Sequence, residues 1–361
     1  MNYIKRCKKC ILPINYPFIK FNKNDVCNYC TNFKNKESKE NEFLKILDQH
    51  RSNKKYDCLV GLSGGRDSVY GLYKLKTKYK MNPLVYTYDW GMNGEISRLN
   101  ISKICGMLGI EQILRASNSQ KIRRLNSLNC KALLSDIQLG MVPVVQALDK
   151  KFLSLGKTIA KENDIDLTIH CTGHTYEQRE FFLGFAGVNQ GLNQNQHMNT
   201  YNLINKIKLG LYYLFHTLKN PRYINMSLLE NFKAYLITFF HGYDYLRLYE
   251  YIEWNEKKIQ STLNDIGFIE SQDYGENQWR MGDTQTAFNN YIYYQLAGFT
   301  EYDDFRSHQI RNGDLTREEA LEFIAKDNLP KINAIKKFCN LVDIDPEFFF
   351  KKVEETKLKI K

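Results

Sequence analysis

The segment from residue 56 to residue 73 constrains the fold of this 361-residue chain most strongly. Its first part, 56–62, is a short apolar run typical of a buried strand, and it leads directly into Ser63-Gly64-Gly65-Arg66-Asp67-Ser68. A helix is expected to begin at Asp67. Glycines permit positive φ and close approach of backbone N–H groups to an anion, and the positive end of the helix faces the same point. The segment therefore predicts an anion-binding loop, with a plain glycine-rich turn as the alternative.

Strand-like and helix-like segments alternate after this loop, as they do in proteins with a parallel sheet. We expect strands at 83–88, 111–115 and 166–171 and helices at 95–108 and 142–163. This order predicts a doubly wound α/β domain over residues 51–180. Ligands of such sheets bind beyond the carboxyl ends of the strands, so the residues that follow the strands are candidates for the site.

Three polar residues follow the expected strands in this way. Asp89 could hold Mg²⁺ or a ribose, or it could cap the turn after its strand. His174 and Glu177 could act as catalytic residues that move protons near the reacting centre, although a His and a Glu after a strand are also ordinary loop residues.

Four cysteines near the N-terminus form two CxxC pairs, Cys7 with Cys10 and Cys27 with Cys30. Two such turns let four thiolates converge on one Zn²⁺, which predicts a structural zinc ribbon; an iron–sulfur cluster or a redox dithiol is the alternative. Four thiolates fill the tetrahedron, so a catalytic zinc is disfavoured. With the charged segment 34–55, read as a helix and linker, the ribbon forms a first unit over residues 1–50.

The composition is that of an ordinary globular protein with a formal net charge of +11. This charge suits an anionic partner such as ATP, a sugar nucleotide or RNA, but scattered surface lysines give the same total. No apolar run approaches the roughly 20 residues that a membrane helix needs, and the aromatic-rich stretches 209–218 and 235–243 are too short. We therefore expect a cytoplasmic protein without stable membrane insertion.

The string Ser63–Ser68 resembles the PP-loop of the ATP pyrophosphatase superfamily, whose fold is adenine nucleotide alpha hydrolase-like. The resemblance implies that Ser63, Gly64, Gly65 and Ser68 hold the pyrophosphate of ATP, with Arg66 at the variable position. It further implies that Asp67 caps the helix or helps to hold Mg²⁺ as a catalytic residue. No Walker GxxxxGK[ST] string is present, which disfavours hydrolysis to ADP.

Several segments together resemble the N-acetyl sugar amidotransferase family. They are 7–13, 26–30, 56–68, 84–90, 252–259 and 306–321. The resemblance implies that an acetamido group of a nucleotide-linked sugar becomes an acetamidino group, with release of AMP and pyrophosphate, in lipopolysaccharide O-antigen or flagellin glycan biosynthesis. The chain contains no Gly-x-Cys-x-Gly nucleophile turn, so the resemblance also implies that a separate glutaminase pair supplies ammonia.

Residues 181–361 are expected to form a mainly helical region that contacts substrate or partner. Within it, the chargeless stretch 181–205 is expected to be a mobile loop over the site or a disordered insert. Thr316 and Glu319 predict a capping box after a helix that ends at Gly313. Arg306, His308 and Arg311 could bind substrate phosphates or a carboxylate, but at helical spacing they could equally be solvated surface residues.

Trp254 and Asn255 lie within the segment 252–259. They are better interpreted as organising a helix junction than as binding a ligand.

A tRNA thiolation enzyme is the alternative function, because it would share the loop and the adenylation chemistry. Cys130 and Cys171 would then be the sulfur-carrying and resolving thiols, although buried thiols are commonly inert. The sequence shows no RNA-binding module and no clustered basic stripe, so a nucleic-acid partner is disfavoured.

Overall fold

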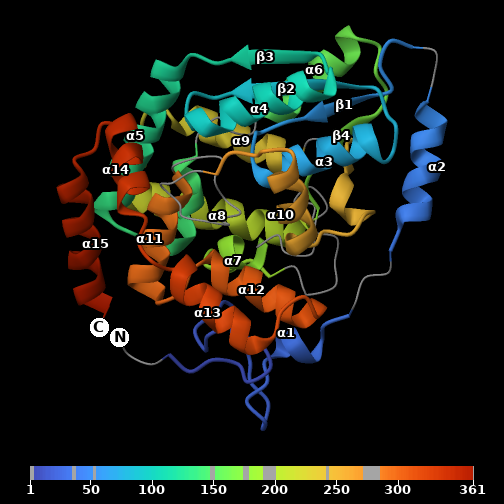
Figure 1. Ribbon diagram of the computed structural model, residues 1–361. Helices are drawn as coiled ribbons and strands as arrows, with labels where there is room; N and C mark the ends of the chain where they lie inside the picture. Colours follow the sequence, from blue (N-terminus) through green and yellow to red (C-terminus); the bar gives the residue numbers. More distant parts are fainter. Residues whose placement is uncertain are drawn as a thin grey trace.

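The computed structural model describes residues 4–34, 38–51, 54–146, 151–173, 179–189, 201–240, 244–270 and 285–360. Figure 1 shows a parallel sheet with its covering helices in the upper part of the view and the C-terminal helices below it. The N-terminal segment with α1 (Asn28–Thr31) lies at the bottom beside the C-terminal helices, and the chain then runs up to α2 (Glu40–His50).

The sheet has five strands in the order β3-β2-β1-β4-β5, and every pairing is parallel. The strands are β1 (Cys58–Gly61), β2 (Pro83–Asp89), β3 (Gln112–Ala116), β4 (Thr168–His170) and β5 (Leu246–Arg247). The chain moves outward from β1 through β2 to β3 and then returns to the other side of β1 as β4. This reversal creates a switch point between β1 and β4, which is where such sheets form a ligand crevice.

Helices cover both faces of the sheet, which confirms the predicted doubly wound α/β class. Successive residues of β1 point to opposite faces: Val60 lies in a core with α2, α3 (Arg66–Thr77), α4 (Glu95–Leu108) and α10 (Glu256–Asp265). Leu59 lies in a second core with Ile159 of α6 (Lys151–Glu162).

The prediction of a single helix over 142–163 was wrong at its beginning. A 3₁₀ helix, η1 (Leu139–Val145), occupies that part, and α6 is described over Lys151–Glu162. Pro143 lies inside η1; a proline has no N–H to donate and clashes with the preceding turn, which favours a short tight helix here.

Helix α5 (Ser119–Ser135) was not predicted. Its sequence is rich in Ser and Asn, which are weak helix formers, so tertiary packing of residues such as Ile122, Leu125 and Leu133 stabilises it.

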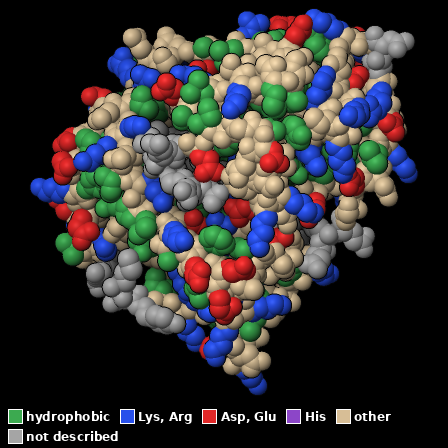
Figure 2. All heavy atoms as spheres, viewed as in Figure 1, with side chains coloured by type: hydrophobic (Ala, Val, Ile, Leu, Met, Phe, Trp, Pro, Cys, Tyr) green, Lys and Arg blue, Asp and Glu red, His purple; other side chains and the backbone are tan. Residues whose placement is uncertain are grey.

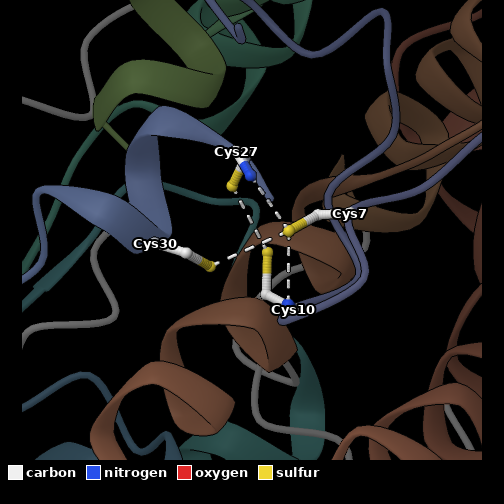
Figure 3. A group of neighbouring side chains, drawn as sticks. All are labelled: Cys7, Cys10, Cys27 and Cys30. Carbon is white, nitrogen blue, oxygen red and sulfur yellow. Dashed lines mark hydrogen bonds between the residues drawn. The ribbon is translucent and has the colours of Figure 1, made fainter. Parts of the chain in front are cut away.

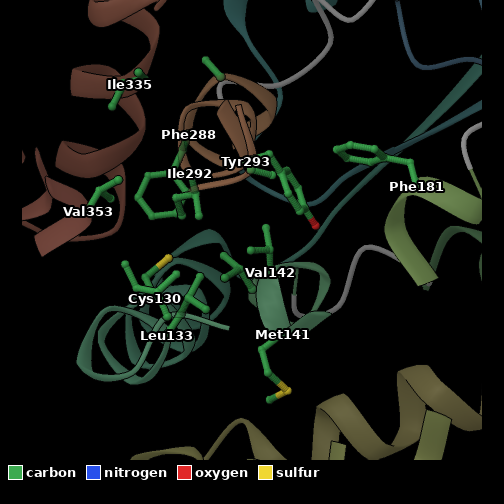
Figure 4. Close-up of a cluster of buried hydrophobic side chains, with 14 of the residues drawn as sticks. Cys130, Leu133, Met141, Val142, Phe181, Phe288, Ile292, Tyr293, Ile335 and Val353 are labelled. Atoms are coloured by element: carbon green, nitrogen blue, oxygen red, sulfur yellow. The ribbon is translucent and has the colours of Figure 1, made fainter. Parts of the chain in front are cut away.

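The C-terminal helices are α11 (Gln285–Ala297), α12 (Glu301–Asn312), α13 (Arg317–Asp327), α14 (Ile332–Leu341) and α15 (Pro346–Ile360). Of these, α11, α14 and α15 contribute buried side chains to a large core (Figure 4). Phe288, Ile292 and Tyr293 of α11 pack there against Cys130 and Leu133 of α5 and residues of η1. Buried cysteines and Tyr16 of the N-terminal segment join the same core.

Two caps in this region agree with the sequence. Thr316 and Glu319 form a complete capping box at the start of α13, and Gly313 ends α12 in the left-handed conformation.

The stretch 181–205 is helical at both ends. Helix α7 (Arg179–Gly184) carries Phe181, which is fully buried, and α8 (Leu203–Lys219) begins before the stretch is complete. Residues 190–200, on which the predicted mobile loop mainly falls, lie outside the described residues. Beyond α8 come η3 (Pro221–Tyr223), α9 (Leu228–Phe240) and η4 (Leu248–Glu250).

The face of the molecule in Figure 2 carries hydrophobic side chains scattered among lysines, arginines and acids. Among the described residues, none of the helices combines the length and apolar character required to cross a bilayer.

Candidate functional site

The glycine-rich loop joins β1 to α3 and lies at the switch point of the sheet. Leu62, the residue after β1, donates its N–H to the carbonyl of Tyr86, so the loop leaves the sheet from a fixed position. Gly65 is the N-cap residue of α3 and has an extended backbone conformation. No side chain at this position caps the helix. The first turn of α3 therefore presents its positive end beside the loop, as an anion site requires.

Two hydroxyl groups close the loop. The Oγ atoms of Ser63 and Ser68 lie 3.0 Å apart, Ser68 Oγ donates to the carbonyl of Gly65 at 2.9 Å, and the N–H of Ser63 donates to Ser68 Oγ at 3.3 Å. Ser63 is exposed, whereas Ser68 is buried. The loop is thus preorganised around hydroxyls that can reorient toward a phosphate oxygen.

Gly64 is required by the packing of the loop against α4. Its φ is +77°, and a Cβ atom at this position would lie 2.1 Å from the carbonyl oxygen of Ser97. Backbone cannot move aside as a flexible side chain can, so any larger residue would push the loop away from the first turn of α4.

Asp67 lies in the first turn of α3 and does not cap it, because Gly65 holds the N-cap position. Its backbone carbonyl accepts a hydrogen bond of 2.6 Å from the hydroxyl of Tyr249, and its carboxylate lies 3.5 Å from Nε of Arg66. The capping alternative for Asp67 is therefore wrong, which leaves its carboxylate as a candidate Mg²⁺ ligand.

Arg66 connects the loop to the C-terminal helices. Its side chain is 1% exposed, its Nη1 donates to Oε1 of Glu256 at 3.0 Å, and its guanidinium lies over the ring of Trp254. Any contribution of Arg66 to nucleotide binding would therefore come from its backbone N–H.

Glu256 continues this connection to α12. Its other oxygen accepts from Arg306 at 2.6 Å and from Gln309 at 2.8 Å, and Arg306 also pairs with Asp327 at 3.0 Å. Arg306 is buried, so the interpretation of this arginine as a solvated surface residue was wrong. Nearby, Asn255 caps α10 and Trp254 packs edge-to-face on Phe305, which confirms that they organise a helix junction.

Asp89 stands at the carboxyl end of β2, and its side chain is engaged locally. Oδ1 accepts the N–H of Gly91 at 2.9 Å, and Oδ2 pairs with Arg98 at 2.9 Å. Of the two roles considered for Asp89, the structure shows the turn cap.

His174 and Glu177, the two predicted proton-transfer residues, lie outside the described residues. The described histidine nearest to that position is His170, on β4. Its ring faces Gly61 and Tyr86 on the side of the sheet that α6 covers, and burial lowers its pKa to about 3. This buried imidazole is neutral and packs between neighbouring strands of the sheet, so its role is structural.

The four sulfurs of the CxxC pairs point toward one another (Figure 3). Cys7 Sγ lies 4.0 Å from Cys30 Sγ, Cys10 Sγ lies 3.7 Å from Cys27 Sγ, and all four atoms lie within 4.8 Å of one another. All four cysteines are buried. Backbone N–H groups of Lys9, Cys10 and Cys27 donate to Cys7 Sγ at 3.3–3.4 Å, which stabilises a thiolate.

These distances fit one tetrahedral ion. Four thiolates at about 2.3 Å from Zn²⁺ are separated by about 3.8 Å along each edge of the tetrahedron. A four-iron cluster spreads its thiolates farther apart, because each sulfur binds a different iron atom. The donor set and its spacing are therefore those of four thiolates that could hold one metal ion.

The cysteine cluster is docked on α12 and α13. Arg317 Nε donates to the carbonyls of Cys7 and Cys10 at 3.3 and 3.1 Å. Arg6 pairs with the fully buried Asp303 at 2.6 Å, and the N–H of Ile11 donates to Ser307 Oγ. Helix α12 thus holds the cluster on one side and the Arg66–Glu256 pair on another.

A further side of α12 carries ionisable groups, three of them buried and His308 partly exposed. They recur every three or four residues and therefore lie on one face of the helix: Glu301, Asp304, His308 and Arg311. Asp304 lies 3.6 Å from His308 Nε2 and 4.0 Å from Arg311 Nη2. The side chain of Arg311 is 1% exposed, yet neither terminal nitrogen has a hydrogen-bond partner among the described residues. Arg311 is therefore not a solvated residue.

Gln285, at the start of α11, shows the same property. It is fully buried, and neither its amide oxygen nor its amide nitrogen has a hydrogen-bond partner in the described part of the chain. A buried polar group without a partner costs about 1–3 kcal/mol, and such groups in native proteins call for a ligand, a water or a functional reason.

Comparison with known proteins gives a limited picture. No protein-family model matches the chain. An uncharacterised protein of Methanocaldococcus jannaschii is 32% identical over 83 residues, a match that covers 23% of this chain and 24% of that protein. The chain therefore spans about a quarter of the length of this relative.

Two solved structures are similar at low scores. The NH3-dependent NAD synthetase from Campylobacter jejuni, in complex with nitrate ion, is 14% identical, with 55% of this chain and 94% of that chain covered and a TM-score of 0.27. The U34-tRNA thiolase NcsA from Methanococcus maripaludis, with its [4Fe-4S] cluster, is 18% identical, with coverages of 75% and 100% and a TM-score of 0.28. At such scores neither likeness bears on the function of this chain.

Proposed function

We propose that this chain is an ATP-dependent, AMP-forming enzyme of the PP-loop kind. The observation that carries the proposal is the loop itself: Ser63 and Ser68 close it, Gly64 lets it pack against α4, and the first turn of α3 opens beside it at the switch point of the sheet. Hydroxyls and a helix end are the groups that hold a pyrophosphate leaving group. To Asp67, an acidic residue in the same turn, we assign the role of holding its Mg²⁺.

The reaction we propose is amidine formation on an N-acetylated nucleotide sugar. The acetamido oxygen attacks the α-phosphorus of ATP, and the bond from that phosphorus to pyrophosphate breaks. Ammonia then attacks the activated carbon, the carbon–oxygen bond breaks, and AMP leaves with the oxygen while the nitrogen loses its extra proton. Activation by ATP is needed because an amide oxygen is a poor leaving group, and enclosure protects the intermediate from water.

We propose that Arg311 and Gln285 each offer a group of the polarity that such an acceptor needs. Both are buried, and both offer hydrogen-bonding groups without partners among the described residues. A nucleotide sugar supplies hydroxyl, amide and phosphate oxygens, which can accept from a guanidinium and an amide group. Binding such an acceptor would satisfy groups that are costly in the free protein.

The competing function, tRNA thiolation, needs an accessible thiolate. Cys171 is packed against Gly71 of α3, in the core that also contains Val60. Cys130 lies in the other large core, which α5 forms with the C-terminal helices. Burial raises the pKa of both thiols, so both are protonated at neutral pH. Their separation into two cores also argues against a sulfur carrier with its resolving partner.

The test is an acceptor comparison. Purified full-length protein is incubated with Mg·ATP and ammonium and with either a panel of N-acetylated nucleotide sugars or bulk tRNA, while AMP, ADP and pyrophosphate are quantified. We expect AMP and pyrophosphate in a sugar-dependent reaction, with an acceptor mass that shows exchange of oxygen for NH. Ammonium stands in for the separate glutaminase that we propose as the natural donor.

Two variants make the result specific. Ser68→Ala removes a loop hydroxyl and should lower kcat at least about 100-fold, whereas Cys171→Ser should leave turnover largely unchanged. Stimulation by tRNA alone, lost in Cys171→Ser, would establish the thiolation enzyme. Release of ADP would contradict both functions.

A further inference from the structure

Helix α8 exposes one complete apolar face. Its exposed large side chains are each 50–66% accessible and recur every three or four residues: Leu203, Ile204, Ile207, Leu211, Leu214, Phe215 and Leu218. Such spacing places all of them on one side of the helix. The other side packs inward through the fully buried Leu209. The helix is therefore apolar both toward the protein and toward solvent.

Helix α9 and the turn before it extend this surface. Their exposed hydrophobic side chains are 39–61% accessible: Ile224, Met226, Leu228, Leu229, Phe232, Leu236 and Phe240. The two helices pack side by side, because Tyr235 donates to the carbonyl of Lys206 and its ring lies against Gly210. Scattered hydrophobic residues are normal on a soluble surface, but a set of this size on two helices that pack side by side marks an interaction site.

The charges around this α8–α9 surface are almost all positive. Residues 201–240 contain five cations (Lys206, Lys208, Lys219, Arg222 and Lys233) and one acid, Glu230, so five minus one gives a net charge of +4. Glu230 is 14% exposed and is shared by Lys121 and Lys233, and Lys219 also reaches Asp136. Lys208 and Lys219 lie along one border of the apolar face, and Lys206 lies along the other.

We propose that α8 and α9 form a docking surface for an anionic lipid bilayer. An amphipathic helix with Leu and Phe on one face and Lys along its borders lies in the interfacial plane of a membrane, with its apolar face among the acyl chains. The 17 residues of α8 and 13 of α9 fit this parallel position, and no described helix could cross the bilayer.

Charge also argues against the other occupants of such a face. In a symmetric dimer built on this surface, the cations of one copy would meet those of the other, which is unfavourable. An anionic bilayer offers both partners at once: acyl chains for the leucines and phosphates or carboxylates for the lysines. The inference does not depend on the enzymatic function proposed above.

The experiment measures binding of the full chain to vesicles by flotation. One set of vesicles is phosphatidylcholine alone, and the other also contains phosphatidylglycerol. We expect binding to the anionic vesicles that weakens as salt is raised, since the cations act through screened electrostatics. The pair Leu211→Glu with Phe215→Glu should weaken it at least about 100-fold, and Lys208→Glu roughly fivefold.

Leu114→Glu is the matched control, because Leu114 is 57% exposed and belongs to β3 rather than to α8 or α9. It should bind like the unmodified protein. All variants change exposed residues, and their Tm values should stay close to that of the parent. Absence of binding to anionic vesicles would overturn the proposal. So would a dimer in solution that Leu211→Glu with Phe215→Glu dissolves, because the occupant would then be a second copy.

Discussion

The glycine-rich loop and the cysteine cluster are both encoded by short local motifs, but they are held in different ways. The loop is closed by its own hydroxyls and backbone, with Ser63 exposed to solvent. The cluster is fully buried, and its sulfurs converge without any covalent link between the two CxxC turns. The loop therefore has its geometry before a ligand binds, whereas the cluster needs a cation to hold four thiolates together.

Helix α12 joins these two regions. Arg306 reaches the loop through Glu256 and Arg66, while Asp303 and Ser307 hold the N-terminal segment that carries the cluster. The comparison teaches that each motif determines its own chemistry, but that a remote helix fixes where the two sites lie relative to each other. The predictions below test this division.

The largest effect is expected from loss of a cluster ligand. Cys27→Ser should remove the bound metal and lower the free energy of unfolding by more than about 5 kcal/mol, because metal binding in such sites is folding free energy. Metal content by mass spectrometry and chemical unfolding measure both quantities. Zinc should be present at one ion per chain in the parent.

Cys105→Ser is the matched control for this prediction, since Cys105 is buried in α4 and lies outside the cluster. It should keep the metal. An iron–sulfur cluster, with more than one iron per chain, would contradict the single-ion site.

A smaller effect is expected where the loop is tied to α12. Glu256→Ala leaves Arg66 and Arg306 as buried charges without their shared carboxylate, and should cost about 3–5 kcal/mol of stability. It should also raise KM for ATP, because the start of α3 loses its support. Glu253→Ala removes only the exposed pair with Lys258 and should cost less than about 1 kcal/mol. Equal effects of the two variants would show that the buried network does not position the loop.

The next effect concerns the strand behind the loop and depends on pH. The folded protein holds the pKa of His170 at about 3 by burial, well below its ordinary value of 6.5. Between these values the unfolded chain binds a proton that the folded chain does not, so stability falls as pH drops below 6.5, by up to about 1.4 kcal/mol per pH unit. His170→Phe should flatten this part of the stability profile. An unchanged slope would mean that other groups cause the acid destabilisation.

The smallest effect on stability is expected at the acceptor side. Gln285→Leu replaces a buried amide that lacks partners, so the free energy of unfolding should stay the same or rise slightly. KM for the sugar acceptor should nevertheless increase about tenfold, with KM for ATP unchanged. A loss of stability without a change in acceptor KM would assign Gln285 a structural role instead.

The sequence was informative where function rests on adjacent residues. The turn from β1 into α3, the convergence of the four cysteines and the Thr316–Glu319 box were predicted correctly as local structure, since their geometry follows from local chain chemistry. Glu256 stood out only as a member of the segment 252–259 that carries the family resemblance. Its link to Arg66 spans 190 positions, which no local pattern encodes.

The features that the sequence did not predict also depend on contacts between residues far apart in the chain. Helix α5 forms through packing against η1 and the C-terminal helices rather than through its own weak propensity. Strand β5 has two residues and was not recognised, because its position at the sheet edge is set by Tyr249 and its neighbours. The burial of Arg306 and Arg311 was likewise invisible, since arginine at helical spacing usually faces solvent.

The most direct test of the central claim follows one oxygen atom. An N-acetylated nucleotide sugar that carries heavy oxygen in its acetamido group is turned over with Mg·ATP and ammonium, and the mass of the released AMP is measured. If the loop serves adenylation of the acceptor, AMP carries the heavy label and the product sugar carries none. Unlabelled AMP, or ADP and phosphate in its place, would contradict the account.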